Sequence, residues 1–133
     1  MSGNILDYFG RKLIKEVRDE TICSLDMMID GKMKGITAQQ ITEKISSFNE
    51  EQLTVIKWLI PKITDLGLYN LLTMVEQNDD IKIMVSNNNI KENSDGLNGE
   101  LYTEDGWITR FSKERYEEIW FKYIKEITGF VAI

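Results

Sequence analysis

The sequence is organised around residues 48–77, FNEEQLTVIKWLIPKITDLGLYNLLTMVEQ, its densest run of regularly spaced apolar side chains. Asn49 is a preferred helix N-cap, and the two glutamates after it lie where the positive end of the helix dipole favours negative charge. Gln52, three residues after the cap, completes a variant of the capping box. These signals predict a helix that begins directly after Asn49.

Apolar residues of this run recur with the helical period and predict one broad face turned toward the core: Leu53, Val55, Ile56, Leu59, Ile60, Ile63 and Leu66. Pro61 has no backbone N–H and its ring clashes with the preceding turn, so we expect a kink or a break there. Gly67 fits the left-handed position that ends a helix, and a second helix follows to about Asn78. The prediction is a helical hairpin at the centre of the fold.

Shorter signals place the remaining elements around this hairpin. Further helices are expected at 4–30, 37–47 and 112–128, the last with Ser112 as its cap. Alternating apolar residues and the tight-turn pair Asp105–Gly106 predict strands at about 81–85, 100–104 and 107–111. The fold class is therefore α+β and mainly α, with about five helices and a small antiparallel sheet before the C-terminal helix. Residues 1–133 are expected to form a single globular domain.

The first helical region changes phase part-way along its length. Leu6 and Leu13 share one face, whereas Ile22 and Ile29 drift away from it when each residue turns the helix by about 100°. Two interpretations remain open. Either the helix breaks near residues 18–21, or its second half is covered on two sides.

Composition excludes several chemistries. The net charge of −6 argues against nonspecific binding of nucleic acid, which requires a basic surface. The chain has no histidine, and this removes histidine-based catalytic triads and histidine metal sites. A single cysteine, Cys23, allows no internal disulfide and no cysteine-rich zinc site, and its apolar neighbours predict that the thiol is buried.

No metal or cofactor site is predicted. A partial EF-hand pattern at 93–96 fails because Lys91 stands where a carboxylate is required and Tyr102 replaces the final glutamate. No glycine-rich phosphate loop is present. The polar N-terminus and the absence of an apolar run near the roughly 20 residues that span a membrane predict a cytoplasmic protein without membrane contact.

Aromatic and arginine side chains supply the candidate binding residues. Trp58 lies off the apolar face of its helix, so either another helix covers it or it anchors a partner. Residues 102–121 bring rings and guanidinium groups together, a mixture typical of interface cores. Alternatively, Trp107 faces inward from a small hairpin while Arg110 faces solvent. The candidate partner contacts are Trp58, Trp107, Arg110, Arg115 and Phe121.

Three classes of function remain open. The first is a small acidic protein-binding domain, such as a bacterial inhibitor or a toxin-neutralising immunity protein. The second is a homodimeric structural or adaptor domain, with Trp58 and Phe121 in its interface. The third is a small-ligand-binding protein or an enzyme without histidine chemistry. The first gains most if Trp58, Phe121 and Arg110 form one exposed patch.

Overall fold

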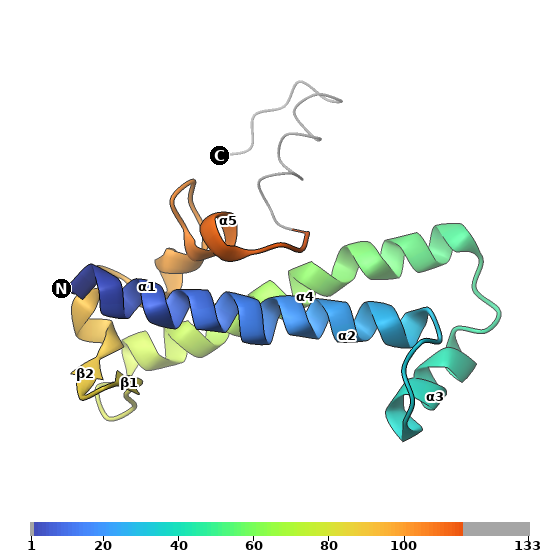
Figure 1. Cartoon of the computed structure of the whole chain (residues 1–133), viewed down its shortest axis with the longest axis horizontal. Coiled ribbons are helices and arrows are strands. Elements are labelled where there is room, and N and C mark those ends of the chain that lie inside the picture. The colour runs from blue at the N-terminus through green and yellow to red at the C-terminus, as the bar shows by residue number, and fades with distance from the viewer. Residues whose placement is uncertain (1, 116–133) are drawn as a thin grey trace.

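The structure is a computed structural model, and it describes residues 2–115 (Figure 1). Helix α1 (Ser2–Leu13), a π-helical turn (Ile14–Arg18) and α2 (Asp19–Ile29) form one uninterrupted helix, called here the N-terminal helix. Two helices follow, α3 (Ile36–Lys44) and α4 (Glu50–Gln77). The remaining elements are short: β1 (Met84–Val85), β2 (Asn88–Asn89), the 3-10 helices Ile90–Asn93 and Leu97–Leu101, and α5 (Trp107–Phe111).

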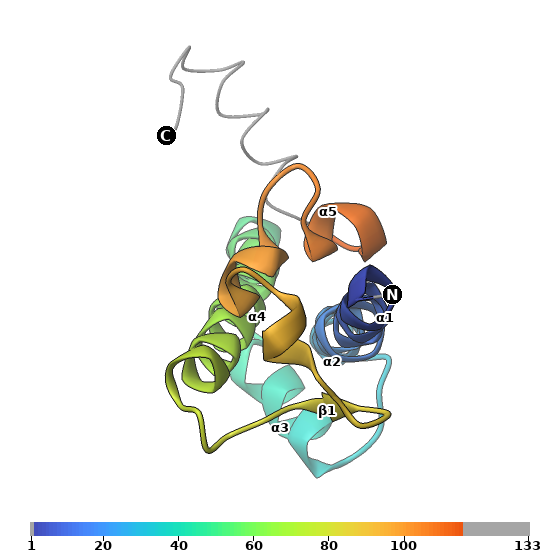
Figure 2. The ribbon, with the colours of Figure 1, turned by 90° about the vertical axis from the view of Figure 1, so that its left-hand side faces the viewer.

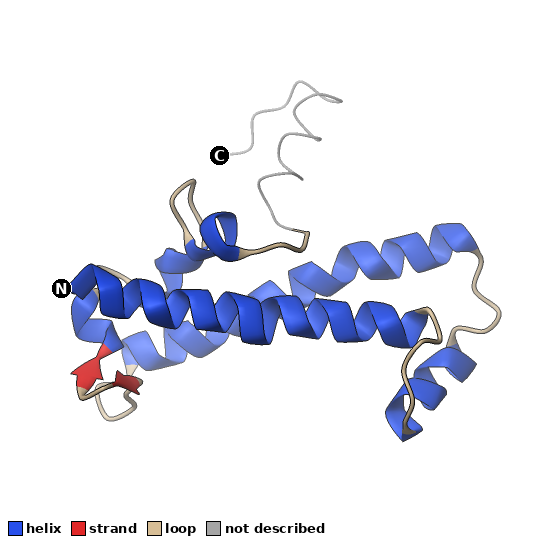
Figure 3. Ribbon diagram, viewed as in Figure 1, coloured by secondary structure: helices blue, strands red, loops and turns tan. Residues whose placement is uncertain are grey.

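Two long helices form the frame of the molecule. Helix α4 runs in the opposite direction to the N-terminal helix and crosses it, with α3 beyond the end of α2 (Figure 1). The two 3-10 helices lie between the long helices at the other end, one against α1 and one against α4 (Figure 2). Within residues 2–115, strands are confined to one small hairpin (Figure 3). The predicted class, mainly helical with a small antiparallel sheet, is confirmed.

The phase change in the N-terminal helix has a local cause. Buried positions recur every four residues through its centre, at Leu6, Gly10, Ile14, Arg18 and Ile22. In an α-helix, such a row would rotate by about 40° at each step. The π-helical turn contains more residues per turn and compensates for this drift. The helix therefore does not break near residues 18–21, and both halves face the same side of the molecule.

The predicted helical hairpin at 48–77 is wrong, because α4 is a single helix of 28 residues. Its start is as expected: the Asn49 side chain accepts from the backbone N–H of Gln52, and the Gln52 side chain accepts from that of Asn49. Pro61 and Gly67 both lie inside the helix. Proline has no N–H to donate to the carbonyl four residues earlier in the helix. The helix can continue through it when another group donates to that carbonyl.

Two of the three predicted strand segments contain no strand. Residues 100 and 101 end the 3-10 helix Leu97–Leu101, residues 102–104 form a bend and a turn, and 107–111 form α5. The predicted turn at Asp105–Gly106 leads into α5 instead of a second strand, and a Cβ added to Gly106 would lie 2.4 Å from the carbonyl oxygen of Tyr102. Only part of 81–85 is a strand, and it pairs with β2 through two residues of positive φ, Ser86 and Asn87. Such a pair suits a two-residue hairpin.

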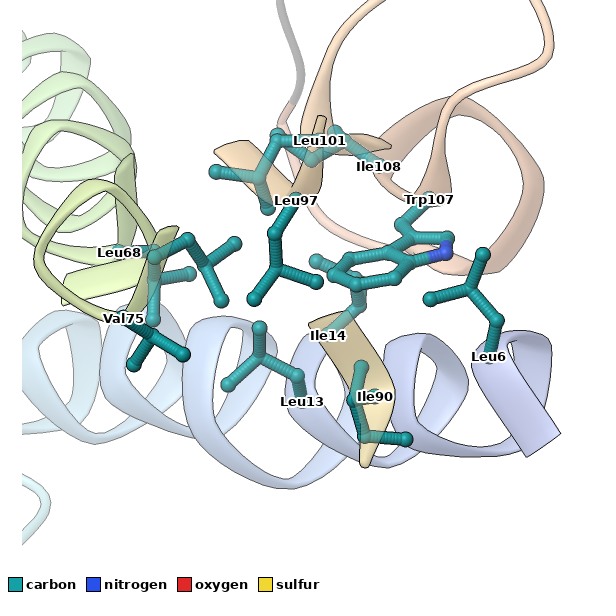
Figure 4. Packing of buried hydrophobic residues seen from close by; sticks show 11 residues of the cluster. Leu6, Leu13, Ile14, Leu68, Val75, Ile90, Leu97, Leu101, Trp107 and Ile108 are labelled. Carbon is teal, nitrogen blue, oxygen red and sulfur yellow. The ribbon is translucent and has the colours of Figure 1, made fainter. Parts of the chain in front are cut away.

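Trp107 is the centre of the core. Its side chain is fully buried and reaches from α5 toward α1, with Leu6 on one side and Leu97 on the other (Figure 4). Phe9 meets it edge-to-face, with ring centroids 5.8 Å apart. Residues 107–111 favour a strand by composition, but the burial of Trp107 in the core outweighs that preference and the segment is helical. Cys23, in contrast, was predicted to be buried but is exposed on α2.

Gly10 sets the distance between α1 and α5. A Cβ built on this residue would lie 2.4 Å from atoms of the Trp107 ring, so even alanine requires one of the two helices to move. Overpacking of this kind costs about 1–3 kcal/mol. We expect Gly10→Ala to lower the free energy of unfolding by that amount, measured by urea denaturation followed by tryptophan fluorescence.

The matched control is Gly67→Ala, which also replaces a glycine inside a helix. Nothing lies within 4 Å of a Cβ at Gly67. Alanine there raises the free energy of unfolding by about 0.5–1 kcal/mol through helix propensity. Equal effects of the two substitutions would contradict the close packing of Trp107 on α1.

Candidate interaction surface

A row of apolar side chains is exposed along the outer side of α4. Val55, Leu59 and Ile63 are spaced by four residues, and Leu66 continues the row. Ile63 is 61% exposed and Leu66 is 60% exposed. We call these four residues the α4 outer face. They occupy the side of the helix opposite the buried Asp65, Leu68 and Leu72.

This arrangement corrects the predicted inward face of residues 53–66. Of the seven residues assigned to that face, Ile60 alone is buried. The reason is that α4 does not break, so its second half fixes which side of the whole helix faces the core. Leu68, Leu72 and Val75 are buried in the core. Asp65 and Pro61 lie on the same side of the helix, one and two turns earlier, and are therefore buried as well. The apolar residues of the first half are consequently left mainly on the solvent side.

Trp58 lies on one flank of the same helix. The residue is 43% exposed. Its exposure does not follow from the sequence reasoning, which placed it off a face expected to be buried, because most residues of that face are themselves exposed. The ammonium group of Lys62 lies 5.4 Å from the centroid of the ring, one helical turn away. A cation over the face of an indole is a favourable contact. Trp58 and Lys62 together form an amphipathic edge beside the α4 outer face.

A buried ion pair fixes the orientation of α4. Arg18 is fully buried, and its Nε and Nη2 donate to the two carboxylate oxygens of Asp65 at 2.6 Å and 3.3 Å. Its Nη1 donates to Asp19 and to the hydroxyl of Ser112. Two-point pairing of this kind specifies direction as well as distance. Asp65 must face the N-terminal helix, and the outer face then points away from it.

Residues 112–115 form a strap that runs from α5 toward α4 (Figure 1). The predicted helix start at Ser112 is wrong, because this residue follows α5 and the strap is not helical. The Asp19 carboxylate accepts from the Ser112 hydroxyl and from the backbone N–H of Lys113, each at 2.8 Å. Arg18 also donates to the carbonyl of Arg115. These bonds replace the expected helix cap.

Arg115 connects the strap to α4 at the proline. Its guanidinium pairs with the Asp26 carboxylate of α2 at 2.9 Å and donates to the carbonyl oxygen of Lys57 at 2.9 Å. In a regular helix that carbonyl would accept from the N–H of residue 61, which proline lacks. The arginine therefore supplies the missing donor, and this is how α4 continues through Pro61.

No protein-family model, curated protein or solved structure matches this chain. Within residues 2–115, no group of three or more Cys, Asp or Glu side chains is arranged to hold a metal ion. No helix in that part of the chain has the length and apolar character to cross a bilayer.

Of the other predicted contact residues, Arg115 lies near Trp58, because it donates to the carbonyl of the neighbouring Lys57, whereas Trp107 and Arg110 lie apart from it. Trp107 is buried in the core, which excludes it from a surface in the folded protein. Arg110 is exposed on α5 and pairs with Asp7 of α1 at 2.8 Å. Figures 1 and 2 show α5 beside α1 and away from the first half of α4, so Arg110 and Trp58 do not form one patch. Phe121 lies outside the described residues.

Two surface carboxyl groups have shifted pKa values. The hydrogen bond from Arg110 holds the pKa of Asp7 below its ordinary value of 3.8, and the same contact raises the pKa of Arg110. The hydrogen bond from Lys57 likewise lowers the pKa of Asp30. Both pairs are partly exposed, so each contributes only about 0–1 kcal/mol to stability.

The link between Arg115 and Pro61 predicts non-additive substitutions. Arg115→Ala leaves the Lys57 carbonyl without its donor and should cost about 1–2 kcal/mol of unfolding free energy. In a Pro61→Ala background, the new backbone N–H can donate to that carbonyl, so the same substitution should cost at least about 0.5 kcal/mol less. Urea denaturation of the four proteins measures the difference. Arg110→Ala, in both backgrounds, is the control and should cost the same in each.

The Asp7 pair predicts a pH-dependent contribution to stability. Because the pKa of Asp7 is lowered in the folded protein, the stabilisation is present above the unfolded pKa and is lost as the pH falls through the folded value. Arg110→Gln should raise the pKa of Asp7 toward 3.8, measured by NMR titration. Its destabilisation at pH 7 should vanish near pH 2, at about 0–1 kcal/mol in size. Lys57→Gln is the control and should shift Asp30 instead of Asp7.

Proposed function

We propose that this protein is a protein-binding domain whose α4 outer face packs against an amphipathic helix of its partner. The observation that carries the proposal is the exposure of four large aliphatic side chains in one row on a helix whose other side carries the buried Pro61, Asp65 and Leu68. Contiguous exposed apolar surface marks interaction sites in proteins of this size.

The spacing of the row favours a helix as the binding element. Val55, Leu59 and Ile63 follow the i, i+4, i+8 line that forms a ridge on a helix surface, and such ridges fit the grooves of another helix. Binding of an added strand would need a longer free edge than the two-residue strands β1 and β2 supply. Trp58 and Lys62 would form the amphipathic rim of the contact.

The net charge of −6 favours a basic partner, since opposite potentials accelerate association. Within this class, an inhibitor or a toxin-neutralising immunity protein is the specific form that we propose. The same apolar ridge could instead pack against its counterpart in a second copy. That alternative makes the protein a homodimeric adaptor, and sedimentation equilibrium at high concentration distinguishes the two by mass.

A matched pair of valines tests the proposal. Val55 belongs to the α4 outer face and is 55% exposed, whereas Val17 is 45% exposed on the N-terminal helix. A photo-crosslinking residue at Ile63, introduced in the producing cells, should identify one partner. Val55→Glu should then weaken binding of that purified partner tenfold or more by calorimetry, because a charge enters an apolar contact. Val17→Glu should leave the affinity unchanged.

Two results would contradict the proposal. One is the absence of any protein crosslinked from Ile63. The other is an equal loss of affinity in both valine variants, which would place the contact elsewhere or indicate general unfolding. Circular dichroism of both variants separates these explanations, because neither valine is buried in the described structure.

A further inference from the structure

The 3-10 helix Leu97–Leu101 is held against the second half of α4, and its first and last residues are fully buried. The backbone N–H of Leu97 donates to Oε1 of Glu76 at 2.5 Å. The side-chain Nδ2 of Asn98 donates to Oγ1 of Thr73 at 3.0 Å. Glu76 and Thr73 are three residues apart and share one side of α4. Two polar contacts with neighbouring turns of α4 therefore hold the start of the 3-10 helix.

Asn98 is followed by Gly99, and this is the only Asn–Gly pair in the sequence. The backbone nitrogen of the residue after an asparagine can attack the side-chain carbonyl carbon, Cγ, and glycine hinders this attack least because it has no Cβ. The bond from the Gly99 nitrogen to Cγ of Asn98 forms, the bond from Cγ to Nδ2 breaks, and ammonia leaves with the proton of the Gly99 N–H. Water then opens the cyclic imide at either carbonyl and leaves aspartate or isoaspartate.

The folded geometry holds the two reacting groups apart. The N–H of Gly99 donates to the carbonyl oxygen of Gly96 at 3.1 Å, and the Asn98 amide is directed to Thr73. The attack requires both hydrogen bonds to break, so the segment must first open from α4. Openings of short segments cost less free energy than global unfolding. The rate of the reaction is then set by how often this 3-10 helix opens.

We propose that Asn98–Gly99 is a site of spontaneous deamidation, reached through local opening of the 3-10 helix Leu97–Leu101 from α4. The product carries a carboxylate at position 98, and this charge weakens the contact of the segment with α4. The inference concerns the opposite half of α4 from the α4 outer face and is independent of the proposed function.

The new carboxylate has no suitable partner at this place. It cannot donate to Thr73, whose hydroxyl already donates to the carbonyl of Tyr69. It also lies near the Glu76 carboxylate, which holds the N–H of the preceding residue, and like charges repel. The reaction is irreversible, so a brief opening is converted into a lasting loss of packing around the buried ends of the segment.

The test incubates the full chain at mildly alkaline pH, folded or unfolded in urea, and locates the replacement of the amide by a carboxyl group by mass spectrometry. We expect reaction at Asn98 in both states, about tenfold or more slower in the folded protein. Thr73→Ala removes the acceptor of the Asn98 amide and should accelerate the folded reaction about fivefold, without effect in urea.

Thr54→Ala is the matched control. Thr54 is also on α4, and its hydroxyl likewise donates to the carbonyl four residues earlier, but it does not contact the 3-10 helix. This variant should react at the original rate. Gly99→Ala should slow the reaction about tenfold in both states. No atom of the described residues lies within 4 Å of a Cβ at Gly99, so the fold accommodates the alanine.

Three results would overturn the site. The first is an unreactive Asn98 in urea, and the second is an equal rate in the Thr73 and Thr54 variants. The third is a folded rate no greater than the urea rate multiplied by the fraction of globally unfolded protein, since only global unfolding would then expose the amide.

Hydrogen exchange tests the effect of the product. Asn98→Asp reproduces its charge, whereas Asn98→Ala removes the same hydrogen bond without adding a charge. The amides of residues 97–101 should exchange about threefold faster in the aspartate variant than in the alanine variant. Equal exchange in the two variants would overturn the effect assigned to the carboxylate.

Discussion

A fully buried guanidinium, that of Arg18, is the constraint on which the arrangement of this protein depends. A buried charge is tolerated only when it is paired and its hydrogen-bonding capacity is satisfied. Arg18 meets this requirement with groups from three parts of the chain: Asp65 of α4, its neighbour Asp19, and the strap at Ser112 and Arg115. Loss of any of these partners leaves a costly buried donor, so the two long helices and the strap are fixed together.

The orientation of α4 follows from this pair, and the surface follows from the orientation. With Asp65 turned inward, the helical period also turns Leu68 and Leu72 inward and places Ile63 on the solvent side. Arg115 reinforces the arrangement, because its bond to the Lys57 carbonyl lets the helix continue through Pro61 without a break. A polar network thus determines where the apolar surface is exposed, and that surface is the basis of the proposed function.

Local signals in the sequence predicted local features well. The capping box at Asn49 and Gln52 forms as expected, because both partners lie within one helical turn. The exposure of Trp58, in contrast, does not follow from its predicted position, because the face from which it was expected to depart is itself mostly exposed. The same reasoning failed at Pro61, since the donor that rescues it, Arg115, is 54 residues away (115 − 61). The buried residues of the N-terminal helix are four apart in the sequence from Leu6 to Ile22, and Arg18 is one of them. This spacing could have indicated both the π-helical turn and the burial of Arg18.

The sequence by itself determined the helical class, the start of α4, the acidic surface and the absence of histidine chemistry, because these depend on composition and on contacts within a few residues. Only the tertiary structure decided which side of α4 is buried. That helix is apolar on more than one side, so periodicity offers two acceptable faces. Which face is buried depends on the ion pair with Arg18 and on the packing of the second half of α4 into the core around Trp107. These contacts exist only once the chain has folded.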